Sequence, residues 1–302
     1  MTVEQLGFDG MPERLYACTP SRLNTWLHCP RRYRMTYLDR PMPPKGPPWA
    51  HNSVGAGVHN ALAAWWRLPE PDRTPTAAGA LLTRGWITEG FRDAEQSAAH
   101  RERARDLVER YTAGLDPSDE PVGVERTVAT RTARIAVSGR IDRLDARGGE
   151  LVVVDYKTGR RPLTQDDARG SLALAIYAVA ASRVLRRPCR RVELHHLPSG
   201  EVAAWEHTAE SLDRHIERAE DIAAEASAAD DAYRARVPKP RRGEPRRGAD
   251  DRSRQVDHAP FDERFPARPG PLCAYCDFAR HCPEGREAAP RKEPWAALPA
   301  DV

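Results

Sequence analysis

The stretch Leu151-Val-Val-Val-Asp-Tyr-Lys157 decides the fold of this chain. Its apolar run predicts a buried strand, and Asp155 and Lys157 come at the end of that strand. Because successive side chains of a strand point to opposite faces, Asp155 and Lys157 share one face. A carboxylate and an ammonium held together there indicate a site for a metal ion and an anion. The alternative is a surface hairpin whose charged side chains are simply solvated.

A second strand comes before this one, at Ile135-Ala-Val-Ser-Gly-Arg-Ile-Asp-Arg-Leu144. The glycine pair at 148–149 lies midway between the two runs, and a two-residue turn there makes them a hairpin. Counting outward from the turn places Asp142 opposite Asp155. Like charges whose Cβ atoms are about 4.5–5.5 Å apart repel each other, so we expect a cation between them.

Hard divalent cations fit that position. Mg²⁺ binds one or two carboxylates together with waters and phosphate oxygens. Such an ion lowers the pKa of a bound water and stabilises charge on a phosphodiester under attack. Lys157 is placed to orient or deprotonate that water, or to neutralise the developing negative charge.

The composition is that of a globular protein, since 40% of the 302 residues are hydrophobic and 30% are charged. This length fits one large domain or two small ones. The net charge of +3 says little about partners, but nine basic residues lie at 234–254 among three acidic ones. The interspersed prolines and glycines predict an exposed segment. It either contacts nucleic-acid phosphates or is a solvated linker.

The sequence contains no apolar stretch near the roughly 20 residues that span a bilayer, and its N-terminus lacks the pattern of a signal peptide. We therefore expect a cytoplasmic protein without membrane contact. Thiols usually stay reduced in the cytoplasm, so the six cysteines indicate metal binding or catalysis more than disulfides.

Hydrophobic periodicity predicts an α/β core with helical elaborations. Residues 1–18 are expected to be irregular. Helices are expected at about 19–37 with a bend at Pro30, at 54–66, in one or two pieces across 77–113, at 167–185 and at 212–233. Strands are expected at about 122–130, 133–145, 150–157, 191–197 and 201–205.

Three cysteines are closely spaced near the C-terminus, as Cys273-x₂-Cys276-x₅-Cys282. A tetrahedral thiolate site needs a fourth ligand, and Cys29 is the best candidate, with Cys18 a weaker one. Such a site ties the two ends of the chain together. By ligand chemistry alone, Zn²⁺ and an iron–sulfur cluster both fit.

Taken together, these residues resemble the RecB-type branch of the PD-(D/E)XK nuclease superfamily, and within it the AddB-like and CRISPR-adaptation nucleases that carry an iron–sulfur cluster. Three segments carry the resemblance in the family's order: Gly55-x-Gly-Val-His59, Gly139-Arg-Ile-Asp142-Arg and Asp155-Tyr-Lys157-Thr-Gly. The split cysteine pattern, one early and three late, also matches, so the resemblance covers nearly the whole chain.

The resemblance implies a restriction-endonuclease-like fold, which is a small mixed sheet flanked by helices. It implies a nuclease domain at 19–233 with a helical insertion at about 54–113, a basic linker at 234–260 and a cysteine-cluster segment at 261–286. Its metal ligands for Mg²⁺ or Mn²⁺ are His59, Asp142 and Asp155. The catalytic residues are Asp142, Asp155, Lys157, Glu125 and Tyr177. The cluster ligands, for [4Fe–4S] rather than zinc, are Cys29, Cys273, Cys276 and Cys282.

One position departs from the family pattern. The family's helix after the strand that carries Asp155 and Lys157 commonly has Gln-x₃-Tyr, and here Ala173 stands four residues before Tyr177. The missing amide bears on catalytic efficiency or substrate positioning more than on metal chemistry. Among the remaining polar and aromatic residues, we expect His195 and His196 to be structural. Trp49, in a proline-rich loop, is a candidate platform for stacking a base.

The predicted function is a metal-dependent DNA nuclease, an exonuclease acting on single strands or duplex ends in repair, recombination or defence. One alternative is a non-catalytic DNA-binding or scaffold subunit of a helicase–nuclease complex. Another is a zinc-stabilised protein with an unrelated hydrolytic role. The sequence has no phosphate-loop motif, so any unwinding must come from a separate helicase chain.

Overall fold

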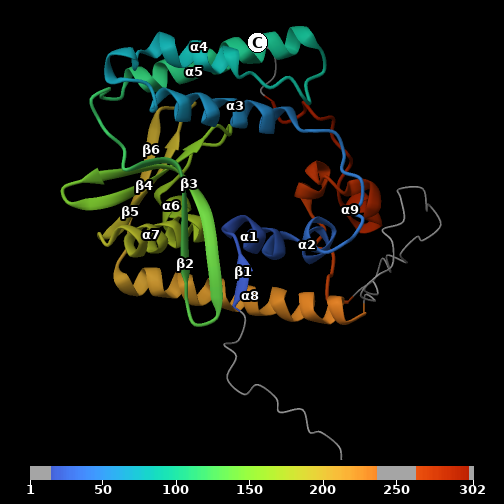
Figure 1. Ribbon diagram of the computed structural model, residues 1–302. Helices are drawn as coiled ribbons and strands as arrows, with labels where there is room; N and C mark the ends of the chain where they lie inside the picture. Colours follow the sequence, from blue (N-terminus) through green and yellow to red (C-terminus); the bar gives the residue numbers. More distant parts are fainter. Residues whose placement is uncertain (1–14, 237–262, 299–302) are drawn as a thin grey trace, which may run out of the picture.

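The computed structural model describes residues 15–236 and 263–298, and in this part of the chain a six-stranded mixed sheet is flanked by helices (Figure 1). The strand order is β1-β3-β4-β5-β6, with β2 paired to β3 outside this path. The strands are β1 Tyr16–Cys18, β2 Gly123–Arg131, β3 Ile135–Arg147, β4 Glu150–Lys157, β5 Cys189–His196 and β6 Glu201–Glu206. The predicted α/β class with a small mixed sheet is confirmed.

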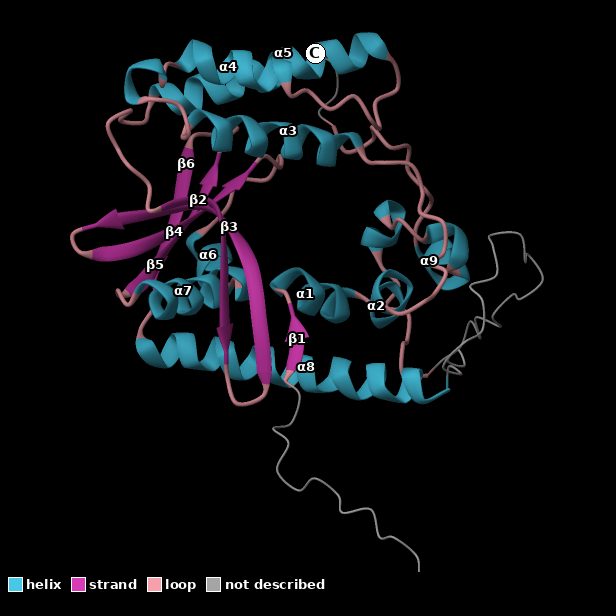
Figure 2. Ribbon diagram, in the orientation of Figure 1, coloured by secondary structure: helices cyan, strands magenta, loops and turns pink. Residues whose placement is uncertain are grey.

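The helices form layers on the two sides of this sheet (Figure 2). They are α1 Pro20–His28, α2 Pro30–Tyr37, α3 Ala50–Trp65, α4 Pro75–Arg84, α5 Ala94–Ala113, α6 Gln165–Gly170, α7 Leu172–Leu185, α8 Ala209–Arg236 and α9 Pro283–Ala288. Helices α3, α4 and α5 make one layer, while α7 and α8 lie on the other side. Three 3₁₀ helices, Glu70–Asp72, Pro271–Tyr275 and Ala279–His281, complete the described elements.

The hairpin of β3 and β4 has the predicted register. Its antiparallel ladder runs from the pair Arg147–Glu150 to the pair Arg143–Val154. Gly148 and the next glycine have φ angles of 57° and 88°, which both central residues of a type I′ turn require and only glycine adopts without strain. The prediction of a glycine turn at 148–149 is confirmed.

Strand β4 is buried from both sides, which explains its unbroken apolar run. Val152 and Val154 pack in one cluster with Trp65 of α3, whereas Leu151 and Val153 pack in another with residues of α7. Burying one such side chain contributes about 1.5–3 kcal/mol. This strand therefore anchors Asp155 and Lys157 to the most buried part of the sheet.

Some predicted boundaries were wrong. Residues 16–18 form β1, which pairs in parallel with residues 135–137 of β3. The helix expected at 167–185 is divided at Ser171, whose side chain accepts a hydrogen bond from the Leu174 amide and caps α7. The helix expected at 19–37 is likewise divided at Cys29, which ends α1 and caps α2.

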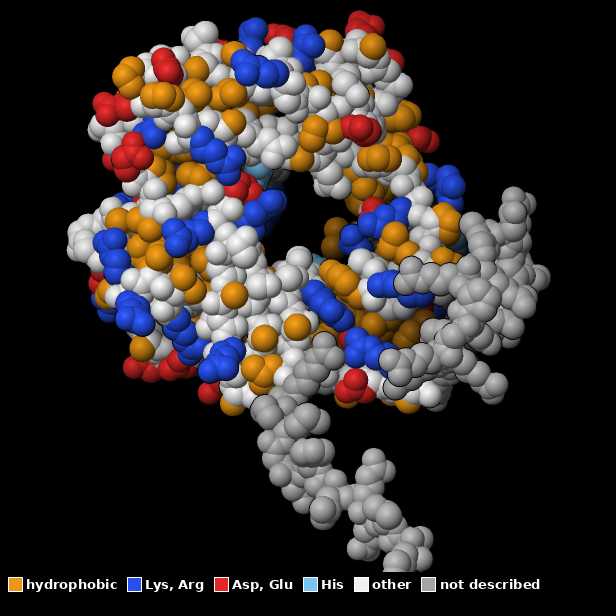
Figure 3. Space-filling view, viewed as in Figure 1, with side chains coloured by type: hydrophobic (Ala, Val, Ile, Leu, Met, Phe, Trp, Pro, Cys, Tyr) orange, Lys and Arg blue, Asp and Glu red, His pale blue; other side chains and the backbone are white. Residues whose placement is uncertain are grey.

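The elements surround an opening through the molecule (Figure 3). In Figure 1, α3 borders this opening above, β2 and β3 on one side, and α1 and α2 below, while the C-terminal segment closes the remaining side. Backbone hydrogen bonds close the ring. The amides of Gly46 and Ala50 donate to the carbonyls of Asp277 and Pro294 at 2.8 and 3.1 Å.

The basic segment predicted at 234–254 lies almost entirely outside the described residues, as does most of the linker predicted at 234–260. Among the residues that are described, no helix is both long and apolar enough to cross a membrane.

Candidate metal centre and cysteine pocket

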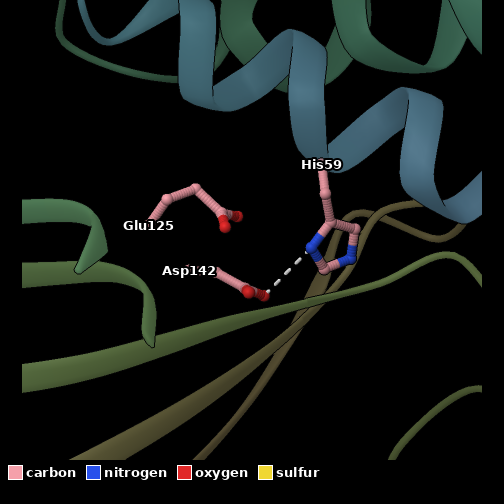
Figure 4. Close-up of side chains that lie close together, drawn as sticks. All are labelled: His59, Glu125 and Asp142. Atoms are coloured by element: carbon pink, nitrogen blue, oxygen red, sulfur yellow. Dashed lines mark ion pairs between the residues drawn. The ribbon is translucent and has the colours of Figure 1, made fainter. Parts of the chain in front are cut away.

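Three potential metal ligands from three different elements meet beside the hairpin (Figure 4). One ligand atom each from His59, Glu125 and Asp142 lies within 4.8 Å of the other two. His59 comes from α3, and the helix can approach because Gly55, one turn earlier, has no side chain. A Cβ at Gly55 would lie 3.4 Å from Thr158 Oγ1, just past β4.

Asp142 is the residue that joins these elements. Its Oδ2 lies 3.3 Å from His59 Nδ1 and accepts a hydrogen bond from the Tyr156 amide at 2.9 Å. The β3–β4 ladder ends at the preceding pair, Arg143–Val154, so the Asp142 carboxylate satisfies the next amide of β4 in place of a backbone carbonyl. The predicted pair of Asp142 and Asp155 lies one position beyond the end of this ladder.

Glu125 reaches the same point from β2. It lies across from Asp142 in the β2–β3 register, between the pairs Val124–Arg143 and Arg126–Ile141. Its φ of 50° is in the left-handed region, which is costly for a residue other than glycine and is found most often at functional sites. Glu125 also forms a 2.6 Å ion pair with Arg140 Nε.

Asp155 and Lys157 form an ion pair with each other on the face predicted for them. Burial raises the pKa of the Asp155 carboxyl, and nearby Asp142 raises it further, although Lys157 and His59 oppose this shift. The Lys157 side chain is 45% exposed, so its ammonium can reach a solvent-borne substrate. Asp155 lies outside the group of three ligand atoms within 4.8 Å.

The electrostatics of the site favour a bound cation. Burial lowers the pKa of His59, but its hydrogen bond to Asp142 and the charges of Asp142 and Asp155 outweigh this, so the net shift is upward. Burial and the charge of Asp142 likewise raise the pKa of Glu125, despite the opposing charge of Arg140. Protons therefore bind these groups more tightly than usual, as expected where negative charge accumulates.

Tyr177 of α7 lies close to the same carboxylates. Burial and the charges of Asp155 and Asp142 raise the pKa of the Tyr177 hydroxyl to about 12. Its ring covers Gly139 of β3 so closely that a Cβ at that position would collide with the ring. This contact gives a physical reason for the glycine in the segment Gly139-Arg-Ile-Asp142.

The four predicted cluster ligands, Cys29, Cys273, Cys276 and Cys282, line one cavity of about 430 Å³. Cys29 is held at the start of α2, where its Sγ accepts a hydrogen bond from the Arg32 amide at 3.4 Å. Burial raises the pKa of the Cys276 and Cys282 thiols, while Arg32 and Arg31 respectively oppose the shift.

Spacing within the cavity bears on which group fits there. A Cβ at Gly285 would lie 3.3 Å from Cys282 Sγ and 3.5 Å from Cys273 Sγ, so this glycine keeps the space between two sulfurs open. A tetrahedral zinc site with Zn–S bonds near 2.3 Å places its sulfurs about 3.8 Å apart. In the described part of the chain, no three cysteine sulfurs all come within 4.8 Å of one another.

Other residues considered from the sequence lie elsewhere. Cys18 is buried in the core cluster beside α1, away from the cysteine cavity. His195 is held by Tyr111 and Glu193, and His196 by Ser199 and the Gly159 carbonyl, so both are structural.

The hypothesis that Trp49 is a platform for a base is wrong, because the residue is 8% exposed. Its indole N–H donates to Asp277 at 3.2 Å and its ring packs against Tyr275. Sequence reasoning also gave no role to Arg140, although the strand register places it diagonally opposite Glu125.

Comparisons with known proteins give the family of this chain. The sequence profile of the PD-(D/E)XK nuclease superfamily matches residues 17–283. A search of the curated proteins finds no match. Among solved structures, a candidate exonuclease from Eubacterium rectale is similar, with 9% identity and a TM-score of 0.42, over 74% of this chain and 90% of that one. The protein SSO0001 is also similar, with 13% identity and a TM-score of 0.37, over 90% and 87% of the two chains.

Proposed function

Because the chain belongs to the PD-(D/E)XK nuclease superfamily, we propose that it is a metal-dependent deoxyribonuclease of the RecB-type exonuclease branch. The observation that carries this proposal is the meeting of His59, Glu125 and Asp142 beside the Asp155–Lys157 pair. Members of this superfamily typically use a divalent metal, and an imidazole among carboxylates accepts Mn²⁺ as well as Mg²⁺.

The residues present fit such an ion. His59, Asp142 and Asp155 would hold it, and Glu125 lies close enough to take part, directly or through water. When bound, the ion supplies positive charge for the phosphodiester and lowers the pKa of a coordinated water. Without an ion, Lys157 and Arg140 provide the countercharges for Asp155 and Glu125.

The chain's own groups then have separate tasks. Lys157 orients the attacking water and neutralises charge that develops on the phosphate, since its ammonium is held at Asp155 and half exposed. Tyr177, whose hydroxyl keeps its proton at neutral pH, lies near Asp155 and Asp142, where its hydroxyl oxygen interacts with the backbone of Arg140. Tyr156 fixes Asp142 through its backbone amide, so the carboxylate is oriented before substrate arrives.

The substrate we propose is a single strand or the end of a duplex. The opening in Figure 3 is consistent with a strand that is threaded from its end, because α3 and β3, which carry His59 and Asp142, both border it. The reaction is hydrolysis of a phosphodiester bond in repair, recombination or defence, with unwinding by a separate helicase chain.

For the cysteine pocket we propose an iron–sulfur cluster, [4Fe–4S], held by Cys29, Cys273, Cys276 and Cys282. A cavity of about 430 Å³ lined by all four cysteines supports this choice. Its task is structural, because the pocket is lined both by residues of α2 and by residues of the C-terminal segment, which are far apart in the sequence. Anaerobically purified protein should be brown, and Cys29→Ser should lose the broad visible absorption. A colourless, folded, zinc-containing protein would contradict the cluster.

A second candidate function is a non-catalytic DNA-binding subunit of a helicase–nuclease complex. The observation that favours it is Ala173, which stands where the family commonly has glutamine. A weakened site of this kind would retain DNA without hydrolysing it in any divalent metal.

The deciding experiment uses end-labelled single- and double-stranded DNA with Mg²⁺ and Mn²⁺. We expect the wild-type protein to release short products and Lys157→Ala to lose at least about 100-fold in rate, as when a transition-state charge partner is removed. Lys45→Ala is the matched control, because it removes an exposed ammonium outside the metal centre. Equal activity in Lys157→Ala and wild type would remove the proposed mechanism.

A further inference from the structure

One face of β2 and β3 carries a row of exposed side chains along the middle of the two strands. In the strand register Thr127 lies opposite Arg140 and Ala129 opposite Ser138, and all four are exposed. Neighbouring side chains in the sequence, such as Val128 and Ile141, point the other way and are buried in one cluster with residues of α7. We call the exposed row of residues 127, 129, 138 and 140, with Ala17 of β1, the β2–β3 strip.

The side chains of the strip are mostly small, and none of them is negatively charged. They are mostly alanine, serine and threonine, and residues 127–141 contain three arginines but no aspartate or glutamate. In Figure 3 the surface over β2 and β3 is largely backbone and small side chains, with basic side chains along its margins. Because these side chains are small and none is negatively charged, a polyanion can approach the strand backbone closely.

One end of the strip meets the metal centre. Arg140 Nε lies 2.6 Å from Glu125 Oε2, and Glu125 belongs to the ligand group with Asp142. Ser138 is four residues before Asp142 on β3, which is about 13 Å at about 3.3 Å per residue. A strand bound along the strip therefore leads directly to the candidate catalytic residues.

The other end of the strip is hollowed into a cavity of about 400 Å³. Arg22 and Tyr37 line it together with hydroxyl-bearing residues: Thr19, Thr130 and Ser138. The Tyr33 hydroxyl accepts hydrogen bonds from Arg22 Nε and Nη2 at 2.9 and 2.6 Å, and Asp230 pairs with Nη2 at 2.8 Å. The Arg22 guanidinium is thereby held in place, 4.9 Å from the centre of the Tyr37 ring.

We propose that the β2–β3 strip binds a single DNA strand and guides it between the Arg22 cavity and the metal centre. This inference rests on the proposed function, since it names the path of the substrate. Arg140 and Arg22 contact backbone phosphates at the two ends, and the Tyr37 ring stacks on an unpaired base. A duplex cannot use the cavity in this way, because the faces of its bases are already stacked on one another.

The test measures binding of a fluorescein-labelled 20-nucleotide oligothymidine by anisotropy, in buffer with EDTA so that no hydrolysis occurs. Ser138→Asp and Ala129→Asp place a carboxylate on the strip without changing the core, and we expect each to weaken binding about tenfold or more. Arg22→Gln should weaken binding and reduce by about one the slope of the logarithm of the binding constant against the logarithm of the salt concentration. Ala224→Asp, at an exposed position of α8, is the matched control and should bind like wild type.

Hydrolysis separates this inference from the proposed function. Ala224→Asp should cleave a single-stranded oligothymidine at the wild-type rate, whereas Ser138→Asp should need at least about tenfold more DNA to reach its half-maximal rate. If the wild type cleaves no DNA but the strip variants still bind DNA more weakly, the proposed nuclease activity is wrong and the proposed DNA binding by the strip is supported. Normal binding by both aspartate variants overturns the strip. A change of oligomeric state with unchanged DNA binding also overturns it, because the face would then contact a second copy of the chain.

Discussion

Asp142 accepts a hydrogen bond from the backbone amide of Tyr156 with the same oxygen that lies 3.3 Å from His59. One carboxylate thus links β3, β4 and α3 at the point where the hairpin ladder ends. The contact to Tyr156 is structural, and the contact to His59 belongs to the candidate metal centre. Two substitutions of Asp142 can separate these roles.

Asp142→Asn keeps an oxygen that can accept from Tyr156 but removes the negative charge. We expect its stability to stay within about 1 kcal/mol of wild type, while Mn²⁺ affinity and nuclease activity fall at least tenfold. Asp142→Ala leaves the Tyr156 amide without its partner and should cost about 1–3 kcal/mol. Urea unfolding and calorimetric Mn²⁺ titration measure the two effects. Full Mn²⁺ affinity in the asparagine variant would argue against Asp142 as a ligand.

Metal binding should strengthen as the pH rises. The pKa values of His59, Glu125 and Asp155 are all shifted upward, so protons remain on these groups at higher pH than usual and compete with the metal. The apparent Kd for Mn²⁺, followed by calorimetry from pH 5.5 to 8, should therefore decrease. His59→Asn should bind more weakly but with a shallower pH dependence. An affinity that is constant over this range would contradict the assignment.

The Glu193 network predicts the acid stability of the fold. Arg147, Arg191 and His195 contact the Glu193 carboxylate at 2.8, 2.7 and 3.0 Å. Burial alone would raise the pKa of this carboxyl, but these hydrogen bonds outweigh it and hold the pKa well below its usual range. A depressed pKa contributes stability above the unfolded-state pKa of about 4.3, and this contribution is lost as the pH falls toward the folded-state value.

Glu193→Gln should therefore lower the free energy of unfolding by about 3 kcal/mol at pH 7, because two guanidiniums lose their charged partner. The difference from wild type should shrink below pH 4, where the wild-type carboxylate begins to take up a proton. Urea unfolding at pH 7 and pH 3 provides the comparison. Glu217→Gln, at an exposed position of α8, should show no such loss at either pH.

The parts of this protein that were predictable from its sequence are those set by local rules. Alternation along a strand placed Asp155 and Lys157 on one face, and the glycine pair at 148–149 set the hairpin register. Both follow from the period of two and from the backbone angles that only glycine adopts freely. The fold class followed from the order of these strands among helices.

The remaining features depend on tertiary contacts or on single backbone angles. Strand β1 has only three residues, too few for alternation to show. Nothing in the sequence indicates that Glu125 adopts a left-handed conformation or that it pairs with Arg140. Trp49 looked like an exposed loop aromatic because its partners, Asp277 and Tyr275, are more than 200 residues away in the sequence.

The contact between Gly139 and Tyr177 yields a final prediction about the site. A Cβ at Gly139 would collide with the Tyr177 ring, which is rigid and cannot yield as a flexible side chain would. Gly139→Ala should therefore cost about 1–3 kcal/mol of stability and displace the hydroxyl that lies near Asp155. The nuclease rate should fall with it, while the Kd for Mn²⁺ changes little, because Tyr177 is not a ligand.

A double-mutant cycle identifies the collision as the cause. The single variant Tyr177→Ala should itself be less stable than wild type. If the new methyl group collides with the Tyr177 ring, adding Gly139→Ala to Tyr177→Ala should cost much less stability than Gly139→Ala costs in the wild type. Gly170→Ala is the control, since nothing lies within 4 Å of the added Cβ there. Additive losses in the double variant would mean that the strand itself, rather than Tyr177, requires a glycine at position 139.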